Sequence, residues 1–147
     1  MIKYNQSCDP NLRSPNKKIV KKITLSVMKK NRIKQGYISL IFGTDNLLFN
    51  IKKKFFNKEE LTDVIAFRLN NYEDPCVEGE IYISLPRAKE NSEIYNEPFP
   101  KEVCRLIIHG SLHLLGFEDN TKKGKEIMRS KEDFFLKGLQ WELLFSN

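Results

Sequence analysis

The stretch HGSLHLLGFED, residues 109–119, decides the fold and the chemistry of this 147-residue chain. The apolar residues before and within it predict a buried helix over about 101–115, followed by a glycine at which the helix ends. His109 and His113 are four residues apart, so their side chains lie one turn apart on the same face of that helix. Two imidazoles at this spacing can bind one metal ion. The glycine lets the chain reverse, which predicts that Asp119 comes back toward the same ion.

The set of His109, His113 and Asp119 leaves a fourth coordination position for water, as catalytic zinc sites do. These are the only two histidines of the chain, which excludes a site of three imidazoles. One Zn²⁺ per chain is the expected cofactor, although the same donors also bind Fe(II), Ni or Mn. The alternative is a pair of core histidines without a metal. Pairing at ligand spacing, followed by a glycine and a carboxylate, favours the metal.

A zinc peptidase of the HExxH class carries its general base directly after the first histidine. Here that position is Gly110, and the nearest carboxylate in the sequence is Glu118. A metallopeptidase-like hydrolase is therefore the second functional class to consider.

Working outward from the motif, β-rich segments at 37–43, 62–69 and 80–85 predict strands, and residues 1–13 predict an extended lead-in. The segment 62–69 is apolar on both faces, which is typical of an inner strand. The polar segment 70–79 is expected to be a loop.

The first helix is expected to begin at Ser14-Pro15 and to end near Gly36. Further helices are predicted at about 44–55, 86–96, 101–115 and 121–137. The predicted fold class is α+β: a small mixed sheet of about four strands with helices packed on it, one of them a zincin-like metal helix. All 147 residues are expected to form a single domain (1–147).

Lysine and arginine number 25 against 19 aspartates and glutamates, a formal net charge of +6 that favours polyanions such as nucleic acid or an anionic membrane. The lysines of the first helix are interpreted as a solvated face. Three cysteines without a CxxC pair indicate reduced thiols. No signal peptide and no stretch of ~20 apolar residues is found, so a cytoplasmic protein with no membrane partner is expected.

The segment CRLIIHGSLHLLGFED, residues 104–119, closely resembles the signature of the YbeY endoribonucleases, the bacterial rRNA maturation factors. FFNKEELTDVIAF (55–67) and GEIYISLPRAKENS (79–92) resemble further segments of that family. The likeness covers most of the chain from about residue 38 to 136. It implies a metal-dependent endoribonuclease that cleaves single-stranded RNA, with the metal held in a basic cleft. It also implies a role in processing the 3′ end of 16S rRNA and in ribosome quality control, with the small ribosomal subunit as partner.

The chain departs from the family pattern at two places. Many members have a third histidine where Asp119 stands, and many carry an arginine a few residues before the Thr-Asp pair, where this chain has lysines. Lys54 and Arg105 are the candidate catalytic cations, and Lys54, Lys58 and Arg105 are the candidate RNA-binding residues. These departures keep a third class open, a non-catalytic ribosome-assembly factor with a structural metal.

Overall fold

A mixed four-stranded sheet forms the base of the fold in the computed structural model, which describes residues 1–146. Its strands lie in the order β1 (Ile2–Cys8), β2 (Gln35–Gly43), β4 (Cys76–Ser84) and β3 (Val64–Arg68). The first three are parallel, and β3 pairs antiparallel with β4 at the edge. The predicted α+β class with a small mixed sheet is thus confirmed.

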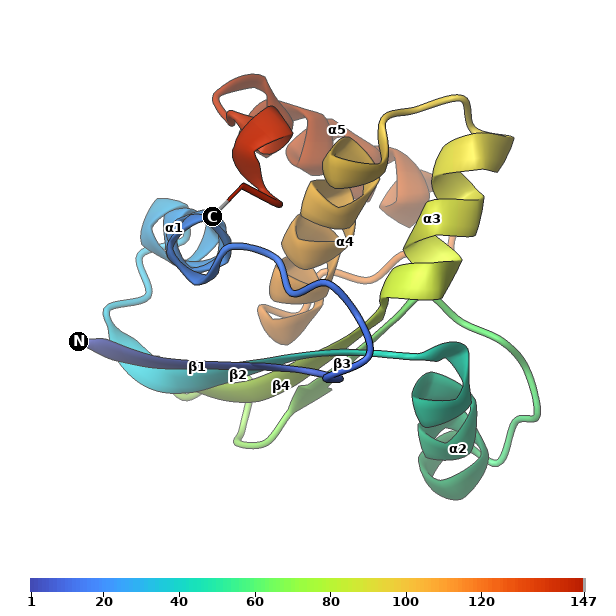
Figure 1. Cartoon of the computed structure of the whole chain (residues 1–147). Helices are drawn as coiled ribbons and strands as arrows, with labels where there is room; N and C mark the ends of the chain where they lie inside the picture. Colours follow the sequence, from blue (N-terminus) through green and yellow to red (C-terminus); the bar gives the residue numbers. More distant parts are fainter. Residues whose placement is uncertain (147) are drawn as a thin grey trace.

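The helices are divided unequally between the two faces of the sheet (Figure 1). One face is covered by α1 (Lys17–Lys30), α3 (Leu85–Ile94) and α4 (Phe99–Leu114), and α5 (Lys122–Lys137) packs against α4. On the other face, α2 (Asp45–Phe56) is the one helix that residues 1–146 provide. A short 3₁₀ helix, Trp141–Leu143, follows α5, and the next two residues of the tail are buried.

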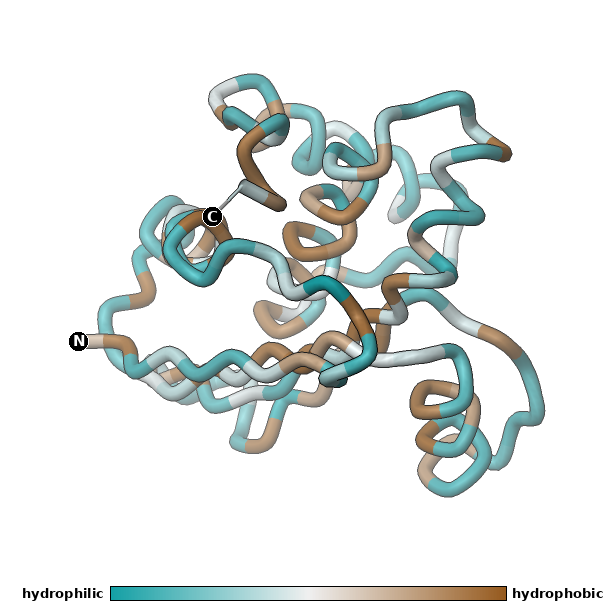
Figure 2. Tube along the Cα trace, viewed as in Figure 1, coloured by the Kyte–Doolittle hydropathy of each residue, from teal (hydrophilic) through white to brown (hydrophobic). Residues whose placement is uncertain are grey.

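The metal helix α4 lies in the middle of the helical layer and carries many of the hydrophobic residues of the chain (Figure 2). Its residues Ile107, Ile108 and Leu112 are fully buried in the core. Gly110 faces the sheet, where a Cβ atom would come within 2.6 Å of the Ile81 side chain. The absence of a side chain at this position therefore lets α4 sit close to β4, and it fixes the height of the histidines above the sheet.

The first helix differs from its predicted bounds at both ends. Its N-cap is Asn16, whose side chain accepts a hydrogen bond from the backbone N–H of Ile19, so Ser14-Pro15 precedes the helix. The helix ends at Lys30, because Arg32 adopts a positive φ of 63° and turns the chain. Gly36 is instead a residue of β2, at which a Cβ atom would overlap the Val77 carbonyl of the neighbouring strand.

The prediction of an inner strand at 62–69 was wrong, because β3 is the edge strand of the sheet. Its second apolar face is covered by a helix: the Phe67 ring stacks on Phe56 and meets Phe55 edge-on, both at 5.6 Å between centroids. The loop predicted for 70–79 is also shorter than expected. Pairing with β2 extends β4 back to Cys76, although its exposed Glu78 gives that segment a polar sequence.

The remaining boundaries lie close to the predictions. Thr44 caps α2 and Thr121 caps α5, each with a side chain that accepts a backbone N–H, and α5 ends at Gly138. Helix α4 begins two residues before its predicted start, because Pro100 lies in the first turn, where a missing N–H costs no hydrogen bond. No helix within residues 1–146 has the length and apolar character needed to cross a membrane.

Candidate metal centre

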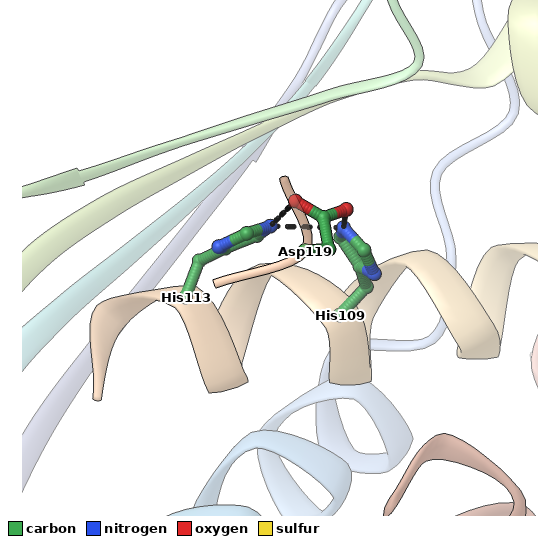
Figure 3. A group of neighbouring side chains, drawn as sticks. All are labelled: His109, His113 and Asp119. Carbon is green, nitrogen blue, oxygen red and sulfur yellow. Dashed lines mark hydrogen bonds and ion pairs between the residues drawn. The ribbon is translucent and has the colours of Figure 1, made fainter. Parts of the chain in front are cut away.

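Two imidazoles and one carboxylate meet at the C-terminal end of α4 (Figure 3). The Nε2 atoms of His109 and His113 lie 3.0 Å apart. The Asp119 carboxylate approaches both, with one oxygen 3.3 Å from His109 Nε2 and the other 3.5 Å from His113 Nε2. One donor atom from each residue therefore lies within 4.8 Å of the other two, the arrangement of a three-ligand metal site.

The end of α4 explains how Asp119 returns to the helix. Gly116 takes a positive φ of 94° and donates its N–H to the His113 carbonyl at 3.0 Å, while Phe117 donates to the Leu112 carbonyl at 3.2 Å. These two bonds form a Schellman motif, which a glycine in this position permits. The chain then reverses within a few residues, and the Thr121 cap starts α5. The loop with Asp119 is thus fixed at both of its ends.

Glu132 is a functional residue that the sequence reasoning missed. It lies on α5, is 4% exposed, and accepts a hydrogen bond from His109 Nδ1 at 2.6 Å. Its other oxygen accepts from Arg105 at 2.9 Å. Placing the His109 proton on Nδ1 leaves the Nε2 lone pair free to face Asp119 and His113, as carboxylate–histidine–metal arrangements require. The signal in the sequence is a carboxylate on the apolar stripe formed by Met128 and Leu136, four residues to either side.

The pKa values of the two imidazoles are shifted in opposite directions. Burial acts to lower the pKa of His109, but the hydrogen bond and charge of Glu132, assisted by Asp119, outweigh burial and raise that pKa. Burial and the neighbouring His109 lower the pKa of His113. Since a metal binds the neutral imidazole, His113 is available as a ligand over a wider pH range, and His109 depends on Glu132 for its orientation.

A large open pocket of about 1200 Å³ adjoins this cluster, with His109 and Asp119 among its lining residues. Acidic side chains outnumber lysines and arginines in the lining by seven to four. The basic cleft implied by the family resemblance is therefore absent from this pocket. Arg105 lines it as predicted, but its guanidinium donates to Glu132 at 2.9 Å and to Asp133 at 3.0 Å.

Lys54 and Lys58 lie elsewhere. Lys54 is in the last turn of α2 with its ammonium 5.4 Å from the centre of the Phe55 ring, and Lys58 follows that helix. Both are exposed, and neither lines the pocket. Their predicted contact with RNA remains a prediction, on a surface separate from the residues around His109.

A chain of polar side chains continues along the pocket away from the histidines. The Asn91 amide donates to Asp63 at 2.9 Å and to Glu102 at 3.4 Å. Glu102 is 5% exposed, and burial raises its pKa to about 7, against the opposing effect of the Asn91 hydrogen bond. The pocket thus holds a carboxyl group that is partly protonated near neutral pH.

Comparison with known proteins identifies the family. The family model described as Endoribonuclease YbeY matches residues 2–140. The chain belongs to the YbeY family. A YbeY protein of Flavobacterium psychrophilum, named Endoribonuclease YbeY, is 37% identical over 139 residues, which cover 93% of this chain and 95% of the relative. The protein of the same name in Karelsulcia muelleri is 43% identical over 111 residues, 75% of this chain and 76% of its own.

The fold of this chain is also found in a solved structure. The solution structure of TM1509 from Thermotoga maritima matches with a TM-score of 0.61 over 93% of this chain and 87% of that one. At 24% sequence identity this likeness establishes the architecture. The two chains therefore share the same overall arrangement of helices over a small sheet.

Proposed function

We propose that this protein is a metal-dependent endoribonuclease that cleaves single-stranded RNA in the maturation of 16S rRNA and in ribosome quality control. The observation that carries the proposal is the convergence of His109, His113 and Asp119 beside an open pocket, in a chain of the Endoribonuclease YbeY family. Its partners are accordingly RNA and the small ribosomal subunit.

The donor set fits zinc. Both imidazoles direct Nε2 toward the Asp119 carboxylate, and Glu132 holds the opposite nitrogen of His109. A bound zinc ion supplies a Lewis acid for a phosphate oxygen and lowers the pKa of a coordinated water. The protein residues have separate tasks: Glu132 fixes the His109 tautomer, Arg105 neutralises Glu132, and Glu102, with a pKa of about 7, can hold or release a proton near neutral pH.

The peptidase alternative lacks support from the structure. The position that carries the general base in an HExxH peptidase is Gly110, which faces β4 with no room for a side chain. Glu118, the nearest carboxylate in sequence, is exposed in the loop after the helix. The alternative of a non-catalytic assembly factor also predicts metal and RNA binding. It differs from the proposal in predicting no RNA cleavage.

RNA cleavage and metal content, measured on the same samples, test the proposal. We expect wild-type protein to hold about one zinc ion and to cut single-stranded RNA, and His113→Ala to lose both. Glu126→Gln, which removes an exposed carboxylate of the same pocket, is the matched control and should retain both.

Three outcomes would contradict the proposal. Cleavage that persists in His113→Ala and in chelator would place the activity elsewhere. Cleavage of an unstructured polypeptide with RNA left intact would indicate a peptidase. Metal and RNA binding by wild-type protein without any cleavage would indicate the assembly factor.

A further inference from the structure

The net positive charge of the chain is concentrated at its N-terminal end. Residues 1–34 hold ten of the 25 lysines and arginines but only one of the 19 acidic residues, a formal charge of +9, and the rest of the chain carries −3. The pocket beside the metal site belongs to the acidic part, since no residue of 1–34 lines it. Attraction of a polyanion to this protein must therefore come chiefly from a surface outside the pocket.

That surface is the solvent side of α1. The helix buries Val20, Ile23 and Val27 against the core and exposes six lysines on its outer side. We call this outer side the α1 basic face; its members are Lys17, Lys18, Lys21, Lys22, Lys29 and Lys30. Two further exposed cations, Arg32 and Lys34, follow it directly.

Within residues 1–146 the lysines of the α1 basic face have no acidic partner, which distinguishes them from the paired lysines of other elements but not from Lys54 and Lys58. Within residues 1–146, none of its six lysines forms an ion pair. Four lysines on other elements each lie within 3.8 Å of a glutamate; these are Lys52, Lys53, Lys89 and Lys101. The charge of the α1 basic face is therefore free to attract an external anion.

The placement of these lysines works against the stability of the helix. The first turn of α1 contains no acidic residue, and Lys17, Lys18, Lys21 and Lys22 occupy its N-terminal half, near the positive end of the helix dipole. Lys17 with Lys21, and Lys18 with Lys22, are also like-charge pairs four residues apart, which repel. This repulsion lowers the stability of the helix in the free protein. Bound phosphates would offset the repulsion and so stabilise the helix.

The α1 basic face reaches the edge of the metal pocket. The ammonium of Lys30 lies 5.1 Å from the centre of the Phe134 ring, and Phe134 is a lining residue of the pocket. This ring is 57% exposed, so it offers an open aromatic surface on which an unpaired base can stack. Lys30 and Phe134 thus connect a basic surface with an acidic site of cleavage.

We propose that the α1 basic face binds the phosphate backbone of single-stranded RNA outside the segment that is cut, and that Lys30 and Phe134 guide the strand into the pocket. This inference rests on the proposed function, because it assigns a second contact surface to the same RNA substrate. Substrate affinity then resides largely on α1, and the acid-rich pocket supplies the chemistry.

Two quadruple variants with equal charge test this assignment. The first, Lys17→Gln/Lys18→Gln/Lys21→Gln/Lys22→Gln, removes charge from the α1 basic face. The control, Lys52→Gln/Lys53→Gln/Lys89→Gln/Lys101→Gln, removes the same charge from lysines that already have acidic partners. Affinity for a single-stranded RNA oligonucleotide is measured as a function of salt concentration in proteins that also carry His113→Ala. Cleavage kinetics are measured in the same quadruple variants with His113 intact.

We expect the α1 variant to bind RNA about tenfold more weakly at low salt and to lose up to roughly 3 units of the slope of log K against log salt, at about 0.7 per phosphate contact. Its KM should rise by a similar factor with kcat unchanged, and its Tm at low salt should equal or exceed that of wild type. The control should change affinity less than twofold. Phe134→Leu should raise KM and leave the salt slope unchanged.

Equal affinities and slopes for the two quadruple variants would overturn the inference while leaving the proposed function intact. Absence of RNA cleavage by the wild-type protein would overturn the proposed function itself. If the α1 variant loses binding to phosphatidylglycerol vesicles but retains its affinity for RNA, the face is a membrane-binding surface and the assignment is wrong.

Discussion

At the scale of single residues, the candidate metal site depends on Glu132, which is not one of the three proposed ligands. The buried Glu132 side chain contacts His109 through one oxygen and Arg105 through the other, and both contacts are partly buried. Without its negative charge, His109 is free to rotate or to exchange tautomers, and Nε2 no longer faces the site at all times. The orientation of the ligand is therefore set from α5, outside the sequence motif.

Glu132→Gln is expected to weaken zinc affinity 10–100-fold, roughly the effect of removing an outer-shell partner of a metal-bound histidine. The isosteric change preserves the volume at a buried position, so folding should persist. Competition with a chromophoric chelator measures the affinity. Asp133→Asn is the matched control, because Asp133 shares Arg105 but does not contact His109. Equal zinc affinity in Glu132→Gln and wild type would remove Glu132 from this role.

Glu102 predicts a pH dependence of stability. Burial raises its pKa from 4.5 to about 7 in the folded protein, so the folded state binds the proton more tightly than the unfolded state. The resulting stabilisation is fully present below about pH 4.5 and is lost as the pH rises through 7. We expect this group to lower the free energy of unfolding by up to about 3 kcal/mol between about pH 5 and pH 8.

Chemical denaturation of Glu102→Gln across this pH range provides the measurement. The glutamine variant cannot ionise, so its free energy of unfolding should fall less steeply with pH than that of wild type. Glu93→Gln, at an exposed position on α3, should follow the wild-type curve. Parallel curves for Glu102→Gln and wild type would show that Glu102 does not titrate in this window.

At the scale of elements, the turn after α4 brings the third ligand to the first two. Gly116 adopts φ 94°, where an L-residue is strained, and a Cβ atom there would meet only the Tyr72 ring at 3.5 Å. The cost of a side chain is therefore conformational rather than steric. Gly138 ends α5 with a negative φ of −94° and has no atom within 4 Å of a Cβ position.

Gly116→Ala is expected to destabilise the protein by about 1 kcal/mol and to lower zinc affinity, because the strained turn displaces Asp119. Gly138→Ala, the matched control, should leave the zinc affinity at the wild-type value. Thermal unfolding and zinc titration of both variants provide the comparison. A wild-type zinc affinity in Gly116→Ala would mean that the loop holds Asp119 without the glycine turn.

The elements that sequence predicted best are those whose signals are local. His109 and His113 lie four residues apart within one helix and Gly116 follows directly after its end, so their mutual placement follows from helix and helix-end geometry. The position of β3 at the sheet edge did not follow, because its apolar outer face reflects contact with Phe55 and Phe56 of α2. Glu132 was missed for the same reason: its partner is 23 residues away.

At the scale of the whole molecule, charge and chemistry occupy different regions. The formal +6 of the chain is the sum of a strongly basic N-terminal segment and a mildly acidic remainder that includes the pocket. Composition alone could predict an affinity for polyanions but not its location, since the α1 lysines and the pocket acids lie in different parts of the sequence. Only the fold brings Lys30 to the rim of the pocket at Phe134.

The metal is expected to stabilise the whole molecule, because its ligands join the core helix α4 to the loop that leads into α5. Binding to the folded state alone adds roughly 3–4 kcal/mol when free zinc is 100–1,000 times Kd. Chelation should therefore lower the Tm of wild-type protein, and adding back zinc should restore it. His113→Ala, which lacks one ligand, should melt at the same temperature with and without chelator. A Tm decrease of equal size in both proteins would indicate that the chelator acts at a site other than His109, His113 and Asp119.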